Sequence, residues 1–94
     1  MQLSFSSVLE NGRDTTAIGR LSVTTRWRAA DEAGGEAERA AALEALMREA
    51  AEYGADGVVD VRFETDDVKG ADIEGVLLRR IVVTGLAVRF KQAA

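Results

Sequence analysis

The sequence predicts an α+β subunit in which one long helix follows a first strand and precedes two more, in the order β-α-β-β. Three observations lead to this fold class. An Ala- and Glu-rich helical pattern stops at Gly54, an alternating strand pattern begins a few residues later at Val59, and the final strand is apolar on both faces. Hydrophobic periods of 3.6 and 2 distinguish helices from strands, so the junction between the two patterns sets the element order.

Composition indicates a single domain that spans residues 1–94. The chain has 94 residues, of which 47% are hydrophobic and 30% charged, a balance typical of a globular chain with one small core. It contains no cysteine and no histidine. Disulfides and thiolate nucleophiles are therefore excluded, as are the commonest general base and the commonest transition-metal ligand.

The charge pattern argues against several classes of partner. The net charge of −4 is unlike that of a dedicated nucleic-acid binder, which needs a basic footprint. No apolar run is long enough to span a membrane, and the first residues lack the basic start and apolar core of a secretion signal. We therefore expect a cytoplasmic protein with no nucleic-acid or membrane partner.

The N-terminal third is expected to form strands. Residues 2–9 alternate weakly, and Asn11-Gly12 is a strong turn signal, so a hairpin with a possible extra N-terminal strand is expected there. The first main strand is expected from near Ile18 to Trp27, because β-favouring residues alternate through that segment.

One helix is expected from Glu36, just after the breaking pair Gly34-Gly35, to Tyr53. Gly54 then occupies the position where a helix end favours the left-handed conformation. The apolar residues recur at three- and four-residue steps, which indicates one buried stripe. The stripe comprises Leu43, Leu46, Met47, Ala50 and Tyr53.

The second main strand is expected over Val59–Glu64, with Val59, Val61 and Phe63 facing the core and the charged residues between them facing away. The polar, glycine-containing segment from Asp66 to Gly75 is expected to be a loop.

The last strand, Val76 to Lys91, is apolar on both faces through its middle, which is typical of a strand covered on both sides. One helix covers only one face of a sheet, so we expect homo-oligomerisation through the other. The alternative is that residues 2–9 fold back over that second face. The expected interface residues are Trp27, Leu77, Ile81, Val83, Gly85 and Ala87.

Two segments carry a family resemblance. Tyr53-Gly-Ala-Asp-Gly-Val-Val-Asp-Val-Arg-Phe63 is similar to "LGA(D/N)AVVGVRF", and Gly85-Leu-Ala-Val88 is similar to the closing "GTAV", of the YbjQ/UPF0145 family. Members of that family are small bacterial proteins of unknown function, sometimes labelled heavy-metal-binding. The match covers about residues 18–90 and is specific in order and spacing.

The resemblance implies a dodecin-like subunit with an antiparallel sheet of order 1-3-2, assembled with copies of itself into a ring, a pentamer. That order places the last strand in the centre, where the apolar pattern independently favours a strand covered on both sides. Two departures bear on any shared ligand site. The segment before the helix lacks the family's glycine-rich insert, and Leu86 replaces the usual Thr after Gly85.

The family label makes metal binding one hypothesis. The available donors are carboxylates, which suit Ca²⁺ or Mg²⁺ rather than thiophilic metals, and their spacing matches no recognised motif. The alternatives are a solvated acidic loop and a site formed only where these carboxylates repeat around a ring axis. The candidate ligands are Asp60, Glu64, Asp66, Asp67, Asp72 and Glu74.

Two further roles are considered. Trp27 is a candidate for stacking on a flavin or another aromatic ligand, by analogy with dodecins, and its alternative role is packing in the core or at an interface. A purely structural ring is the other role, in which strand arginines meet acidic helices of neighbouring subunits. Asp60 and Glu64 share a strand face, but Arg62 between them neutralises the pair, so we expect no enzymatic activity. The cofactor, if any, is unknown.

Overall fold

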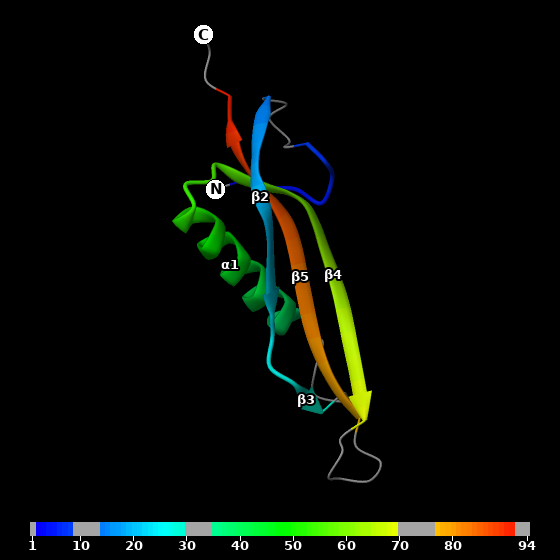
Figure 1. The fold of residues 1–94 in the computed structure, drawn as a ribbon. Coiled ribbons are helices and arrows are strands. Elements are labelled where there is room, and N and C mark those ends of the chain that lie inside the picture. Colours follow the sequence, from blue (N-terminus) through cyan, green and yellow to red (C-terminus); the bar gives the residue numbers. More distant parts are fainter. Residues whose placement is uncertain (1, 9–13, 30–34, 70–76, 92–94) are drawn as a thin grey trace.

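In the computed structural model, one helix packs on one face of a single five-stranded sheet (Figure 1). The structure describes residues 2–8, 14–29, 35–69 and 77–91. The elements are β1 (Gln2–Leu3), β2 (Thr15–Thr24), β3 (Arg28–Ala29), α1 (Glu36–Glu52), β4 (Gly57–Lys69) and β5 (Leu77–Phe90).

The sheet has the order β1-β4-β5-β2, with the short β3 also paired to β5. Both β2 and β4 run antiparallel to β5, so the predicted 1-3-2 order of the main strands, with the last strand central, is confirmed. An extra N-terminal strand exists, but β1 pairs parallel to β4 and not with β2. The expected hairpin with β2 is therefore wrong, while the Asn11-Gly12 turn lies outside the described residues.

The helix ends as its sequence predicts. Gly54 has a φ of 76°, a left-handed conformation that costs glycine little. Its N–H donates to the Ala51 carbonyl and the N–H of Ala55 donates to the Ala50 carbonyl, the paired bonds of a Schellman motif. Arg89 on β5 donates to the carbonyls of Gly54 at 3.3 Å and Tyr53 at 3.4 Å. The Arg89 guanidinium therefore lies at the negative end of the helix dipole. The last turn of α1 itself contains no basic residue to interact with that end.

The core lies between α1 and the sheet. Leu46 and Ala50 are fully buried there, as the stripe predicts, whereas Tyr53 is 56% exposed because it lies beyond the last helical turn. Gly85 at the centre of β5 lies so close to α1 and β4 that a Cβ there would be 2.5 Å from Val58 Cγ1 and 3.3 Å from Leu46 Cδ2. The other buried members of this cluster are Ala42, Val61, Val83 and Ala87.

A β-bulge in β4 changes which side chains face the helix. Val59 pairs with Leu86 and Arg62 with Thr84, so two residues of β4 oppose the single Gly85. Asp60 at the bulge has a φ of 53°. The extra residue reverses the alternation, so Val58 and Val61 face α1, while Val59 packs with Val88, Leu86 and Phe90. The prediction that Val59 faces the helix with Val61 is therefore wrong.

The far part of the β4–β5 hairpin, Thr65–Lys69 with Leu77–Ile81, extends past the first turn of α1 as an arm (Figure 1). The expected loop from Asp66 is wrong for Asp66–Lys69, which pair with Leu77–Arg80 and continue the strand. The radius of gyration is 16.0 Å, compared with about 12 Å for a compact domain of this length. Within the described residues, no helix is both long and apolar enough to cross a membrane.

Candidate functional site

Two ion pairs cross the arm between β4 and β5, one on each face of the sheet. Arg79 makes a two-pronged contact with Asp67, with Nε donating to Oδ1 at 2.7 Å and Nη2 donating to Oδ2 at 3.1 Å. Arg80 Nε donates to Asp66 Oδ2 at 3.0 Å. The hydrogen bonds from Arg79 hold the pKa of the Asp67 carboxyl below its ordinary value, and Asp67 raises the pKa of Arg79. The carboxylates of Asp66 and Asp67 are therefore both paired with arginines.

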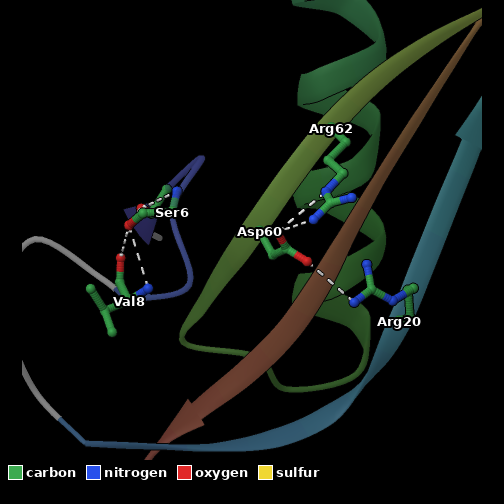
Figure 2. A network of polar contacts seen from close by, with 6 residues as sticks. Ser6, Val8, Arg20, Asp60 and Arg62 are labelled. Atoms are coloured by element: carbon green, nitrogen blue, oxygen red, sulfur yellow. Dashed lines mark hydrogen bonds and ion pairs between the residues drawn. The ribbon is translucent and has the colours of Figure 1, made fainter.

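A third acidic residue lies at the bulge, on the face opposite α1. Figure 2 shows Asp60 between two arginines from different strands, Arg20 of β2 and Arg62 of β4, each 3.3 Å from a carboxylate oxygen. The backbone N–H of Asp60 donates to the Ser6 carbonyl at 2.7 Å, which ties the N-terminal segment to the bulge. One carboxylate faces two guanidinium groups, so this cluster carries a net positive charge.

The structure does not bring the predicted metal ligands together. Asp60 and Asp66 lie on one strand, about 20 Å apart along its axis at 3.3 Å per residue, and Asp66 and Asp67 point to opposite faces. Glu64 is exposed opposite Val82. Asp72 and Glu74 lie outside the described residues. In the part of the chain that the structure describes, no three acidic side chains form a group able to hold a metal ion.

Trp27 lies in the short segment between β2 and β3. The ladder to β5 is irregular there. The Thr25 N–H donates to the Ile81 carbonyl at 2.9 Å, but the Ile81 N–H donates to the Thr25 side-chain hydroxyl at 2.8 Å and not to a backbone carbonyl. Trp27 is 42% exposed, and the guanidinium of Arg80 lies 4.5 Å from its ring centroid. Trp27 is therefore a surface residue, and its proposed ligand role stays a prediction.

A cleft of about 440 Å³ opens beside this tryptophan, between the end of β2 and the first turns of α1. Arg28 and Glu38 approach within 3.8 Å on its helix side. The lining residues are Thr25, Arg26, Trp27, Arg28 and Glu38.

The predicted oligomer interface divides into two sets. Ile81, Val83 and Ala87 are fully buried, and Gly85 packs against Leu46, so this face of β5 is occupied inside the chain and cannot form a surface between copies. That part of the prediction is corrected: both faces of β5 are apolar, and the pattern alone does not say which one α1 covers. By contrast, Trp27 between β2 and β3 is 42% exposed, and Leu77 at the start of β5 is 40% exposed.

The face of the sheet opposite α1, hereafter the open face, carries the other side of β5. Its apolar centre is flanked by Arg20, Ser22 and Thr24 on β2 and by Arg62 and Glu64 on β4. None of the described helices lies on this face. The β5 residues that it presents are Val82, Thr84, Leu86, Val88 and Phe90.

Sequence reasoning missed the contact between Arg20 and Asp60, which join positions 40 residues apart. No local sequence pattern indicates a contact between residues so far apart in the chain. A signal for the bulge was present, however. Asp60 stands where the similar family segment has Gly, and aspartate is one of the few residues that tolerate positive φ.

Fold and site together define a class: small α+β proteins with one helix on one face of a sheet and arginine-paired carboxylates along its strands. The chain belongs to the YbjQ_1 family, described as "Putative heavy-metal-binding", whose family model matches residues 9–91. The resemblance found in the sequence is thereby confirmed. None of the curated proteins matches the chain.

A solved structure shares the fold. It is a protein of unknown function of the DUF74 family from Pediococcus pentosaceus ATCC 25745, with a TM-score of 0.73 and 13% sequence identity. The similarity covers 97% of this chain and 98% of that one. At this identity the likeness shows a common fold and carries no argument about a ligand.

The family description does not fit the donors of this chain. Thiophilic metals are bound chiefly through thiolate and imidazole groups, and the sequence has no cysteine or histidine. Three of the candidate carboxylates, Asp60, Asp66 and Asp67, already contact arginines. A metal displacing those arginines would leave their charges uncompensated, so these carboxylates do not fit a heavy-metal site.

Proposed function

We propose that this chain is the subunit of a homo-oligomeric ring, a pentamer, with an assembly role rather than an enzymatic one. The observation that carries the proposal is the projecting β4–β5 arm, which exposes Val68 and Leu77 at 44% and 40%. A monomer of 10.1 kDa would hold these two large apolar side chains in water on an extended arm, which is unfavourable. Packing the arm against another copy removes them from water.

The total surface supports the same proposal. The chain exposes 6291 Å², whereas a compact monomer of this mass exposes about 5,300 Å². The excess, about 1,000 Å², is comparable to the roughly 800 Å² that one partner buries in a stable interface of ordinary size. The open face supplies further apolar area around Leu86.

The sheet edges favour a closed assembly. The outer side of β2 has no partner strand among the described elements, and β1 pairs with only the first two residues of β4. Unpaired edges invite further strand pairing, and a ring satisfies them without open-ended growth. The pentameric copy number comes from the family resemblance alone.

Light scattering and native mass spectrometry test the proposal. The wild-type chain is expected at a multiple of 10.1 kDa, and Leu77→Glu and Val68→Glu are expected to shift it toward the monomer. Ala41→Glu, which places the same charge on the exposed surface of α1, is the control and is expected to leave the mass unchanged. A wild-type chain that stays monomeric at high micromolar concentration would refute the proposal.

A carboxylate metal site between subunits is the second candidate, favoured by the family description alone. In a ring, the acidic residues of β4 repeat around the axis, and oxygen donors of that kind suit Ca²⁺ or Mg²⁺. Calorimetry on the assembled protein tests it. Binding that disappears when Leu77→Glu dissociates the ring would support a site formed only by assembly.

A further inference from the structure

The cleft between the end of β2 and α1 has the features of a small-ligand site. Its volume of about 440 Å³ falls within the 300–1,000 Å³ typical of ligand pockets. It is built where the β2–β5 ladder is irregular at Thr25, a feature of the kind that re-aims side chains next to functional sites. Its lining residues come from the segment Thr25–Arg28 and from Glu38 in the first turn of α1.

The aromatic wall of the cleft is held in place. The Arg80 guanidinium lies over the Trp27 ring at 4.5 Å, and Asp66 fixes Arg80 through a 3.0 Å hydrogen bond. This row of three side chains from β4, β5 and the segment after β2 orients the indole while leaving 42% of Trp27 exposed. A ring that is already ordered loses little conformational entropy when a planar ligand stacks on it.

The cationic wall is only partly neutralised. Glu38, whose side chain is 13% exposed, lies 3.8 Å from the guanidinium of Arg28 and offsets its charge. Arg26 is exposed, and within the described residues its guanidinium makes no ion pair or hydrogen bond. Among the residues that the structure describes, the cleft therefore presents one uncompensated guanidinium, that of Arg26, beside the indole of Trp27.

We propose that this cleft binds a small planar aromatic molecule carrying a phosphate or carboxylate group. The ring of the ligand stacks on Trp27, and its anionic group accepts hydrogen bonds from Arg26. Glu38 opposes a second negative charge on the Arg28 side, which limits the ligand to one anionic group. The ring proposal depends on Val68 and Leu77 of the arm, whereas this site depends on Trp27 and Arg26, so either proposal can fail without the other.

The experiment uses the single Trp of the chain as its reporter. The full-length protein, in its native oligomeric state, is titrated with AMP and with indole-3-acetate, and the one indole N–H cross-peak is followed by NMR. The uncharged counterparts adenosine and indole-3-acetamide are titrated in parallel. We expect at least one anionic probe to shift the peak saturably and to bind roughly tenfold more tightly than its neutral counterpart, because a charge-assisted hydrogen bond is lost in the latter.

Variants assign the contact. Arg26→Gln is expected to weaken the anionic probe roughly tenfold and to leave the neutral probe unchanged. Arg48→Gln, on the exposed surface of α1 away from the cleft, is the matched control and is expected to change neither. Trp27→Leu, read by saturation-transfer NMR of the probe, is expected to weaken both members of a pair.

Three results would overturn the proposal. The first is that no probe saturates by about 10 mM, and the second is that charged and neutral probes bind equally. The third is that the indole peak moves with protein concentration and not with probe, which would mean that an acidic segment of a neighbouring subunit occupies the cleft.

Discussion

Replacing Gly85 with alanine tests the helix–sheet packing directly. A Cβ at this position would lie 2.5 Å from Val58 Cγ1 and 3.3 Å from Leu46 Cδ2, whereas carbon atoms in contact are normally about 3.5–4.0 Å apart. Val58 and Leu46 are fully buried on separate elements, so neither moves without disturbing the core.

Overpacking of one methyl group costs about 1–3 kcal/mol, and the gain from removing a glycine in a strand offsets about 0.5–1 kcal/mol. Gly85→Ala is therefore expected to lower the free energy of unfolding by about 1–2 kcal/mol, a fall in Tm of roughly 5–15 °C for a domain of this size. Thermal and urea unfolding should be compared at one protein concentration, because assembly adds to the apparent stability.

Two further variants make the result decisive. Gly19→Ala is the control, since a Cβ there meets nothing within 4 Å and is expected to be neutral or slightly stabilising. Val58→Ala removes the clashing methyl group, so adding Gly85→Ala to it should cost at least about 1 kcal/mol less than in the wild type. Equal costs in both backgrounds would refute the packing argument.

The remaining predictions concern charge. Asp60→Ala is expected to destabilise the chain by about 1 kcal/mol more than Asp60→Gly in urea unfolding, because both lose the arginine contacts but only alanine is strained at a φ of 53°; equal losses would contradict this. The pKa of Asp67 is lowered when folded, so its pairing with Arg79 stabilises above the ordinary carboxyl pKa of 3.8 and is lost as the pH falls through and below that value. The Tm difference between wild type and Asp67→Asn should accordingly shrink from neutral pH to below 3.8, and a constant difference would count against the assignment. Calorimetry with Ca²⁺, Mg²⁺ and Zn²⁺ should show at most weak binding, and tight Zn²⁺ binding would show that the donor argument is wrong.

The helix and the strand order could be predicted because their signals are local or inherited from a family pattern. The Ala- and Glu-rich stretch ends at Gly54 both in the sequence pattern and in the structure, with the glycine at positive φ. The extent of β4 could not be predicted in the same way. Asp66 and Asp67 are polar and resemble a loop, but in the structure they are strand residues paired with Arg80 and Arg79, which lie opposite them on β5.

Individual residues of the candidate site could be predicted from the sequence, but their arrangement in space could not. Trp27 was singled out as the only tryptophan, yet the cleft beside it depends on the irregular ladder at Thr25 and on Arg28 meeting Glu38 across the edge of the sheet. The acidic residues of β4 were grouped as metal ligands because they are close in sequence. Alternation along a strand separates such neighbours onto two faces, and arginines from other strands then pair with them.

The sequence by itself determined the element types, the end of α1, the absence of thiol and imidazole chemistry, and the apolar character of both faces of β5. Those properties depend on side-chain type and on period, which are readable one segment at a time. Only the tertiary structure decided which face of β5 α1 covers. Along β4, the bulge at Asp60 determines which side chains face α1, because one extra residue reverses the orientation of every side chain beyond it. The residues opposite and in contact with the bulge, Gly85 and Arg20, lie on other strands, so no single segment of the sequence reveals it.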